Sequence, residues 1–393
     1  MKETVFPGSA VIFCRVIDNF GDIGICWRLA RQLTIDYQMA IYLVVDDVQV
    51  LQRIEFAVKP HIASQVVERV RVIGWNAWRC YADLSAVDVV ITGFGCALPA
   101  EFVGLLAARI VKPIWIDLEY LSAETWVDGF HGMTSPDAFL PITKHFFFPG
   151  FSHASGGLLR ETGLLAQRER FQNEATIRAF FDEHRIARRQ GGANHYYLVV
   201  SLFCYSGAPV QCLFSVWENG ILPIVCLVPE GVATEAVSAF LGHEALPGAS
   251  RTRGNLTVEV FALMRQSEYD RLLWACDVNF VRGEDSFVRA QWAGKPVVWQ
   301  IYPQDEGAHW PKLDAFIDRY TSAAPDDLRR ALMDLFHAWN GKGDIASAWK
   351  ACGDSFGAPA SPAWSNHAFK WADGLAQDSD LATRLLQYVR KLS

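Results

Sequence analysis

Short apolar segments typical of buried β-strands alternate with helical patterns along the whole 393-residue chain. The expected strands are residues 10–17, 40–45, 69–73, 89–92 and 113–117 in the first half, and 196–204, 222–228, 256–260, 278–281 and 296–302 in the second. The expected helices are residues 26–32, 63–68, 233–242, 267–275, 287–293 and 326–339. Strands separated by helices indicate parallel βαβ units with helices on both faces of a sheet. The sequence therefore predicts an α/β fold with two Rossmann-like series.

A charged stretch at residues 166–194 separates the two series and closes on Gly191-Gly192. We predict an N-terminal Rossmann-like domain at residues 1–165, a linker helix at 166–194 and a second Rossmann-like domain at 195–375. Residues 376–393 begin with an Asp/Ser cap signal and predict an amphipathic helix that joins the N-terminal domain. Its apolar positions are Leu381, Leu385, Leu386, Val389 and Leu392.

The composition suits a folded protein of the cytoplasm. Hydrophobic residues make up 51% and charged residues 20%, which supports packed cores. The apolar runs are shorter than the ~18 residues of a membrane span, and no secretion signal precedes the first strand, so we expect no membrane association. Nine scattered cysteines without a CxxC pair are typical of reduced thiols. A net charge of −7 argues against nucleic acid as the partner.

The loop after the first expected strand, residues 16–24, carries the carboxylates Asp18 and Asp22 four residues apart. Gly21 and Gly24 allow a tight turn and the close approach of a ligand. Two acids on one loop could bind a guanidinium through bidentate, charge-assisted hydrogen bonds, or one could act as a general base. The structural alternative makes Asp22 the N-cap of the next helix and Asp18 a turn residue.

A second loop, Arg282-Gly283-Glu284-Asp285-Ser286, joins an expected strand to a helix. A helix N-terminus offers N–H groups and the positive end of the helix dipole, which suit a diphosphate. Arg282 and Ser286 would add donors to such a site. Glu284 and Asp285 would contact a hydroxyl group or a cation, or would only stabilise the first helical turn.

A third group of residues falls at or near strand ends of the second half: Phe203, Tyr205, Gln266 and Tyr302. Aromatic rings there could stack on a nucleobase or ribose, and the Gln266 amide could read the edge of a base. Each of them could instead be a core residue. The chain contains no HExxH, GxSxG or GxxxxGK[ST] motif, so metalloprotease, α/β-hydrolase and P-loop functions have no support.

Four long segments go beyond generic patterns: "FCRVIDNFGDIGICWRLARQL", "WIDLEYLSAETWVDGFHG", "FFFPGFSHASGGLLRE" and "YDRLLWACDVNFVRGEDSFVRAQWAGKPVVWQIYPQ". They resemble, in the same order, the protein-arginine rhamnosyltransferases that modify translation elongation factor P. The resemblance implies a GT-B glycosyltransferase architecture, with two Rossmann-like domains facing a cleft. It also implies that the donor, dTDP-β-L-rhamnose, binds the C-terminal domain and that elongation factor P docks on the N-terminal one. Rhamnose would pass to an arginine with inversion, without a metal ion or other cofactor.

The resemblance also assigns residues. The family's functional carboxylates match Asp18, Asp22 and Glu284, and Asn19 and Gly21 belong to the same acceptor loop. The family's donor-binding positions match Phe203, Tyr205, Gln266, Arg282, Asp285, Ser286 and Tyr302. The chain departs from the family at Leu263, three residues before Gln266, where family members carry an aromatic residue; Phe261 lies nearby.

Arginine is a poor nucleophile because its guanidinium keeps its proton up to a pH above ~12 and its lone pairs are delocalised. We therefore expect Asp18 and Asp22 to orient the guanidinium, with Asp22 accepting the proton as the C–N bond forms. Glu284 would orient or act electrostatically. The leaving diphosphate would be stabilised by the helix N-terminus and by Arg282, Ser286 and Tyr302, in place of a metal ion.

Two other functions stay open at this point. One is another nucleotide-sugar enzyme on the same architecture, such as a transferase with a small-molecule acceptor or an epimerase. The other is a non-catalytic module that binds elongation factor P. The pair Asp18 and Asp22 together with the complete 282–286 loop favours the enzyme over the binding module.

Overall fold

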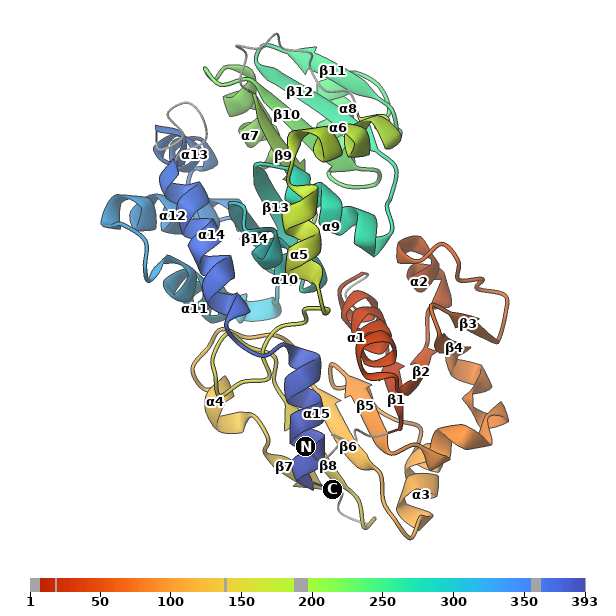
Figure 1. The fold of residues 1–393 in the computed structure, drawn as a ribbon. Helices are drawn as coiled ribbons and strands as arrows, with labels where there is room; N and C mark the ends of the chain where they lie inside the picture. The colour runs from red at the N-terminus through yellow and green to blue at the C-terminus, as the bar shows by residue number, and fades with distance from the viewer. Residues whose placement is uncertain (1–7, 18–19, 138–139, 187–196, 355–361, 393) are drawn as a thin grey trace. The chain divides into compact units, whose positions relative to one another are not determined.

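The computed structural model describes residues 8–17, 20–137, 140–186, 197–354 and 362–392 (Figure 1). The chain divides into two compact units. Unit 1 comprises Met1–Leu164 and Gln377–Ser393, and unit 2 comprises Leu165–Ala376. The expected linker at 166–194 thus belongs to unit 2, and its residues 187–194 lie outside the described residues.

Unit 1 is built on an eight-stranded sheet with the order β3-β4-β2-β1-β5-β6-β8-β7. Most neighbouring strands are parallel, and the β3–β4 and β7–β8 pairs at the two edges are antiparallel. Its strands are β1 (Ser9–Cys14), β2 (Ala40–Val45), β3 (Ser64–Val67), β4 (Val70–Gly74), β5 (Val89–Gly93), β6 (Ile114–Leu118), β7 (Thr134–Pro136) and β8 (Thr143–Phe147). Its helices are α1 (Gly21–Tyr37), α2 (Val48–Ile54), η1 (Trp75–Cys80), η2 (Ala82–Ala86), α3 (Ala100–Ala108), α4 (Val127–Phe130) and α15 (Leu381–Leu392).

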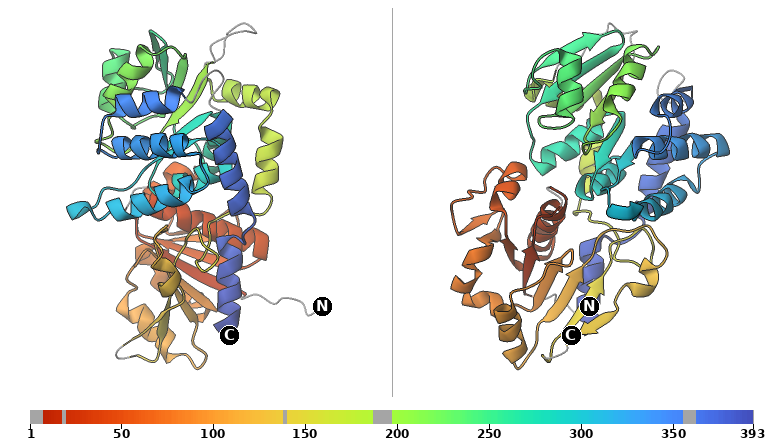
Figure 2. Two further views of the ribbon diagram at one scale, coloured as in Figure 1. Left: turned by 90° about the vertical axis from the view of Figure 1, so that its left-hand side faces the viewer. Right: turned by 180° about the vertical axis from the view of Figure 1, so that it is seen from behind.

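The sheet of unit 1 is buried on both faces, as expected for parallel strands. Along β1, Ile12 and Cys14 pack into one apolar cluster with α1 and α15, whereas Val11 and Phe13 face a second cluster with α3. The predicted terminal amphipathic helix is confirmed as α15. Figures 1 and 2 show it against the same unit as β6 and β8, although Leu392 is exposed and does not join the core.

The expected helix at residues 63–68 is wrong. These residues form the edge strand β3, which pairs antiparallel with β4 so that Val67 faces Val70 across a two-residue turn. The turn residues Glu68 and Arg69 have φ of 50° and 67°. Such a pair of positive φ values matches the right-handed twist of the flanking strands. The turn lacks the Gly or Asn that normally marks this geometry. The sequence of residues 63–68 therefore gave no signal of a hairpin, and a helix was expected there instead.

Unit 2 is built on a six-stranded sheet with the order β11-β12-β10-β9-β13-β14. All neighbouring strands are parallel except for the edge strand β11, which is antiparallel to β12. The strands are β9 (Leu198–Leu202), β10 (Ile224–Pro229), β11 (Ser250–Arg253), β12 (Leu256–Phe261), β13 (Val278–Arg282) and β14 (Val297–Gln300).

Helices cover the unit 2 sheet, and Figure 2 shows α11–α14 (blue) grouped together. The helices are α5 (Leu164–Phe171), α6 (Glu174–Glu183), α7 (Val210–Glu218), α8 (Thr234–Leu241), α9 (Gln266–Ala275), α10 (Asp285–Ala293), η3 (Asp305–Gly307), α11 (Trp310–Thr321), α12 (Asp326–Trp339), α13 (Ile345–Asp354) and α14 (Pro362–Ala376). Two parallel-dominated sheets in one chain confirm the predicted α/β fold class. Among the described residues, no helix combines the length and the apolar character needed to cross a bilayer.

Candidate functional site

The sequence-predicted donor residues gather where the strand order of unit 2 reverses. The chain places β10 on one side of β9 and β13 on the other. In open parallel sheets, such a reversal leaves a crevice beyond the carboxyl ends of the two strands, where ligands bind. Phe203 and Tyr205 follow β9, and Arg282 ends β13. The structure therefore brings these predicted residues to the edge at which ligand binding is expected.

Arg282 is the centre of this group. Its guanidinium carbon lies 4.4 Å from the centroid of the Phe203 ring and 4.6 Å from that of Tyr205. Nη1 of Arg282 also donates to the carbonyl of Cys204, at 3.2 Å. Tyr302, after β14, meets the Tyr205 ring edge to face at 5.4 Å and is 47% exposed. The result is a cation held against two aromatic faces, with a half-exposed phenol beside it.

The N-terminus of α10 completes the donor group. The Ser286 hydroxyl donates to the carbonyl of Arg282, at 2.5 Å, and accepts the Arg282 backbone N–H, at 3.3 Å. The Ser286 hydroxyl hydrogen is thus used within the protein, and the hydroxyl fixes the backbone of the arginine. Glu284 occupies the N-cap position of α10, and within the described residues its side chain does not cap the helix. Asp285 lies in the first turn, as the structural alternative also expects.

Helix α9 approaches the same place through its first residue. Nε2 of Gln266 donates to Oδ2 of Asp285, at 2.9 Å, which joins the starts of α9 and α10. Behind this contact, Arg289 and Asp270 form a buried bidentate ion pair between the two helices, with N–O distances of 3.0 and 2.7 Å. Three of the predicted donor residues, Gln266, Asp285 and Ser286, therefore lie on a braced pair of helices.

The position of Leu263 bears on which ring could cover a base. The backbone N–H of Leu263 is held by the Glu230 carboxylate, at 2.9 Å. The neighbouring Phe261 is buried in β12, with 5% exposed. Phe203 and Tyr205, which are partly exposed, are better placed to offer an aromatic face to a ligand.

In unit 1, the acidic loop follows β1 and leads into α1. Asp18 and Asn19, predicted as functional, lie outside the described residues. Asp22 is the second residue of α1, whose N-cap is Phe20, so the alternative that Asp22 is the N-cap is wrong. The Asp22 side chain is 1% exposed, and its Oδ2 accepts the Ile17 backbone N–H, at 2.7 Å. Asp22 therefore holds the stem of the loop as well as the start of the helix.

A second carboxylate fixes the same stem. Asp46, just after β2, accepts the Val16 backbone N–H, at 2.9 Å. Asp46 also lines a cavity of about 430 Å³ at the carboxyl ends of β2 and β4, together with Asp47 and Trp75. The Arg15 guanidinium lies 5.3 Å from the Trp75 ring. Sequence reasoning missed Asp46, because an acid after a strand also reads as a turn residue.

The strand order of unit 1 reverses between β1 and β5, so the corresponding crevice lies beyond these two strands. Phe94 follows β5 with φ of 58°, a left-handed conformation that is an outlier for a bulky residue and costs about 1–3 kcal/mol. Tyr120, after β6, stacks on Phe94 with ring centroids 4.6 Å apart and 25° between the planes. Sequence reasoning missed both residues; the only signal was an aromatic residue before Gly95 at a strand end.

Cysteine chemistry is disfavoured at both crevices. Burial raises the pKa of the Cys204 thiol to about 12. The pKa of Cys14, the last residue of β1, is raised by its hydrogen bond with Cys26 and by burial. Both thiols are therefore neutral at physiological pH, whereas a nucleophilic cysteine must be a thiolate.

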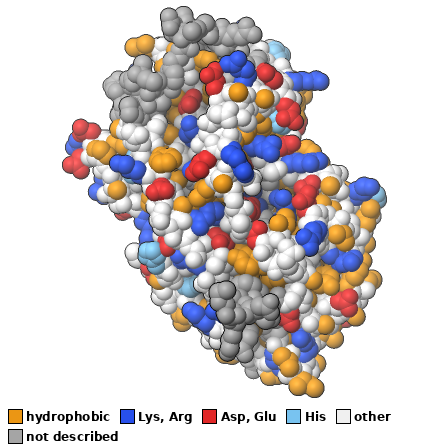
Figure 3. Space-filling model, viewed as in Figure 1, with side chains coloured by type: hydrophobic (Ala, Val, Ile, Leu, Met, Phe, Trp, Pro, Cys, Tyr) orange, Lys and Arg blue, Asp and Glu red, His pale blue; other side chains and the backbone are white. Residues whose placement is uncertain are grey.

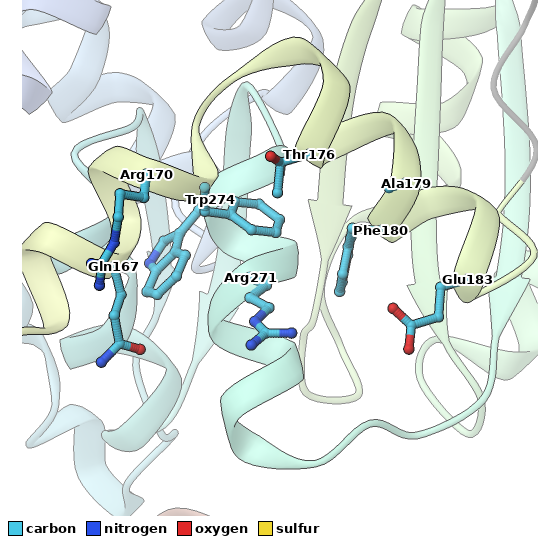
Figure 4. Close-up of a pocket in the computed structure, with 9 residues that line it drawn as sticks. Gln167, Arg170, Thr176, Ala179, Phe180, Glu183, Arg271 and Trp274 are labelled. Atoms are coloured by element: carbon cyan, nitrogen blue, oxygen red, sulfur yellow. The ribbon is translucent and has the colours of Figure 1, made fainter.

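A separate pocket of about 360 Å³ lies in unit 2 between α5, α6 and α9. Figure 4 shows Arg271 and Trp274 of α9 among side chains of α5 and α6, including Arg170 and Glu183. None of the residues that line this pocket is a predicted donor-binding residue. On the face drawn in Figure 3, Lys and Arg side chains lie among Asp and Glu side chains.

Comparisons with known proteins identify the family. The sequence profile of the EarP family, described as elongation factor P (EF-P) rhamnosyltransferase EarP, matches residues 10–390. The protein-arginine rhamnosyltransferase of Pseudomonas putida is 43% identical over 380 residues, which cover 96% of this chain and 98% of that protein. Its counterpart in Pseudomonas aeruginosa is 41% identical over 378 residues, or 96% of this chain and 97% of that protein.

A solved structure agrees. It is described as the structural basis for EarP-mediated arginine glycosylation of translation elongation factor EF-P, and it matches with a TM-score of 0.67 at 33% identity. The match covers 98% of this chain and 99% of the other. The chain is therefore a glycosyltransferase that belongs to the EarP family of elongation factor P rhamnosyltransferases.

Proposed function

We propose that this protein transfers L-rhamnose from dTDP-β-L-rhamnose to an arginine side chain of translation elongation factor P, with inversion at the anomeric carbon. The observation that carries the proposal is the convergence of seven predicted donor residues at the strand-order reversal of unit 2, in a chain of the EarP family. The group combines a fixed guanidinium, aromatic faces and a helix N-terminus, which together suit a nucleoside diphosphate.

The donor would be held by its diphosphate and its base. The Arg282 guanidinium and the backbone N–H groups at the start of α10 supply positive potential for the diphosphate. Because the Ser286 hydroxyl is bonded to Arg282, its contribution is to position the arginine. Tyr302, which follows β14, adds a hydroxyl donor, and Phe203 or Tyr205 offers a ring on which thymine or the ribose can stack.

The chemistry requires that a guanidinium nitrogen attack the anomeric carbon from the face opposite the diphosphate. As the N–C bond forms, the C–O bond to the diphosphate breaks and dTDP leaves with the bonding electrons. Attack on a β-linked donor gives an α-linked product. The nitrogen becomes acidic during bond formation and passes its proton to a carboxylate, for which we favour Asp22. Asp18 and Glu284 would orient the guanidinium or stabilise charge.

The proposal includes two conditions of the reaction. The positive charge of Arg282 and of the α10 N-terminus takes the place of a divalent cation, so transfer needs no metal ion or other cofactor. The reaction takes place in the cytoplasm, where a translation factor is available, without a role for nucleic acid or membranes as partners.

Intact-mass analysis of elongation factor P tests this function. The acceptor protein is incubated with the enzyme and dTDP-β-L-rhamnose, and the product is mapped by peptide sequencing. We expect one deoxyhexose increment on one arginine, and none when that arginine is replaced by lysine. Turnover of the donor without any increment on the acceptor would instead favour another nucleotide-sugar enzyme. Binding of the acceptor without turnover of the donor would favour the non-catalytic module.

A further inference from the structure

An aromatic pair stands at the carboxyl edge of the unit 1 sheet, where β5 and β6 lie side by side (Figure 1). Phe94 follows β5 directly, and Tyr120 lies two residues beyond β6. The rings are stacked, and Phe94 is 7% exposed whereas Tyr120 is 38% exposed. One ring is therefore the buried support, and the other presents aromatic surface at the edge of the sheet. We call Phe94 and Tyr120 the aromatic platform.

The backbone under the platform adopts a strained conformation. Phe94 and Gly95 both have positive φ, 58° and 67°, and the Phe94 N–H donates to the Leu118 carbonyl at the end of β6, at 2.6 Å. A glycine at position 94 would adopt this turn without strain. Strain at a bulky residue persists where the surrounding structure enforces it, and such residues cluster at ligand-binding sites. Here the strain places the Phe94 ring beneath Tyr120.

The platform lies next to the start of α1. A Cβ atom on Gly93 would come within 2.8 Å of Cys26 Sγ, so the end of β5 touches the face of α1 that carries Cys26. Asp22 is four residues earlier on the helix, which puts it on the same face and one turn nearer the N-terminus. Cys14, at the end of β1, is close enough to Cys26 for a hydrogen bond, and the negative charge of Asp22 raises the pKa of the Cys14 thiol. Asp22 therefore lies beyond the carboxyl end of β5, on the same face of the sheet as the Phe94 ring.

We propose that the Tyr120 ring, supported by Phe94, is the surface on which the acceptor guanidinium lies flat while the Asp22 carboxylate binds its edge. A guanidinium is planar, delocalised and more weakly hydrated than an ammonium, so it stacks on an aromatic face. A carboxylate beside a flat ring fits that chemistry and discriminates against lysine. Tyr120 is then a positioning residue that selects arginine. This inference rests on the proposed function in one respect, namely that the substrate group is a protein arginine.

The test compares Tyr120→Leu with Tyr120→Phe. Leucine keeps an apolar cover over Phe94 but removes the aromatic face, whereas phenylalanine keeps both. We expect Tyr120→Leu to raise the KM for elongation factor P about five- to thirty-fold, with kcat at saturating acceptor within about two-fold of wild type. Tyr120→Phe should restore the wild-type KM. Phe56→Ala, which removes another half-exposed aromatic side chain of unit 1, is the matched control and should leave KM unchanged.

A second measurement does not depend on rhamnose transfer. Ligand-observed NMR titration with methylguanidinium should detect weak binding to the wild type and to Tyr120→Phe, and much weaker binding to Tyr120→Leu. Methylammonium should bind none of the three. An unchanged KM for Tyr120→Leu, or equal methylguanidinium binding by all variants, overturns the platform. If elongation factor P is not modified at all but methylguanidinium binding still depends on the ring, the proposed function fails and the platform stands.

Discussion

Replacing Asp22 by asparagine or by alanine separates the chemical role of this residue from its structural role. The side chain is 1% exposed, and Oδ2 accepts the Ile17 backbone N–H at 2.7 Å. Asparagine has nearly the same size and can accept that hydrogen bond through its amide oxygen, but it is not a base. Alanine loses both the base and the acceptor. Both variants therefore lack the base, but only the asparagine variant keeps the hydrogen bond to the Ile17 N–H.

The magnitudes follow from these contacts. For Asp22→Asn, the loss of a negative charge in the first turn of α1 costs about 0.3–1 kcal/mol of unfolding free energy. For Asp22→Ala, the Ile17 N–H also loses its partner, at a cost of about 1–3 kcal/mol. A unit of this size loses about 2–4 °C of melting temperature per kcal/mol. The melting temperature should therefore fall by roughly 1–4 °C for Asp22→Asn and by roughly 3–16 °C for Asp22→Ala. Turnover should fall at least ~100-fold in both variants, which is about 2.7 kcal/mol of activation free energy.

The assay is a time course of rhamnosylated elongation factor P by intact-mass analysis at saturating donor and acceptor. Calorimetric titration with dTDP is the control, and its affinity should not change because the predicted donor residues belong to unit 2. A fully active Asp22→Asn enzyme would refute a catalytic role and transfer it to Asp18 or Glu284. If Asp22→Ala alone lost activity, and by no more than its loss of stability explains, the role of Asp22 would be limited to holding the loop in place.

Four further predictions address the donor unit, the metal and pH. Asp270→Asn removes the carboxylate charge paired with the buried Arg289 guanidinium and should lower the unfolding free energy by about 3–5 kcal/mol, measured by thermal denaturation; a loss below about 1 kcal/mol would contradict the ion pair between α9 and α10. Tyr302→Phe should weaken dTDP binding by about 1–3 kcal/mol in calorimetry, and unchanged affinity would remove Tyr302 from the diphosphate site. Turnover should survive excess EDTA, whereas loss on chelation that magnesium or manganese restores would overturn the metal-free mechanism. Burial lowers the pKa of His131 below its usual value near ~6.5, so the unfolded state takes up a proton first and stability falls as the pH drops below that value. His131→Asn keeps an acceptor for the Phe148 N–H and should show a smaller drop in melting temperature between pH 7.5 and 5.5 than the wild type; an equal drop would assign the pH dependence to other groups.

Most of the fold was readable from the sequence because buried parallel strands are continuous apolar runs. The expected strand at residues 256–260 differs from β12 by a single residue. The expected strand at 10–17 runs three residues past the end of β1. Val16 and Ile17 are apolar and extend the pattern, but their backbone N–H groups bond to Asp46 and Asp22 and not to a neighbouring strand. Hydrophobicity could not reveal this change of partner.

The sequence could single out the predicted donor residues because their chemical types suit a nucleoside diphosphate. Arg282 and Ser286 are polar residues at a strand-to-helix junction, a place where the helix N-terminus gives them an evident use. The sequence did not indicate that the Ser286 hydroxyl is bonded to the Arg282 backbone. A residue type shows which hydrogen bonds a side chain can make, and the fold decides which of them it makes.

The aromatic platform depends on properties that the sequence alone does not predict. The usual role of Phe94 and Tyr120 is core packing, and twenty-five Phe residues give no reason to single one out. What distinguishes Phe94 is a backbone angle, and what distinguishes Tyr120 is the ring beneath it. Both properties arise from the neighbouring strand β6, which contributes the carbonyl of Leu118. They are products of the tertiary fold.

The two units share one topological feature, a reversal of strand order. In each unit the strand order reverses beside the first strand, at β1 and β5 in unit 1 and at β9 and β13 in unit 2. The reversal separates the loops at the carboxyl edge and leaves room for a ligand. In unit 2 that edge holds a guanidinium against aromatic rings, which suits an anion. In unit 1 the same edge carries the buried Asp22 carboxylate and the stacked rings of Phe94 and Tyr120, which suit a cation. A nucleotide sugar with a charged diphosphate and an acceptor with a charged guanidinium require this opposition of sign, so each unit is matched in charge to one of the two proposed substrates.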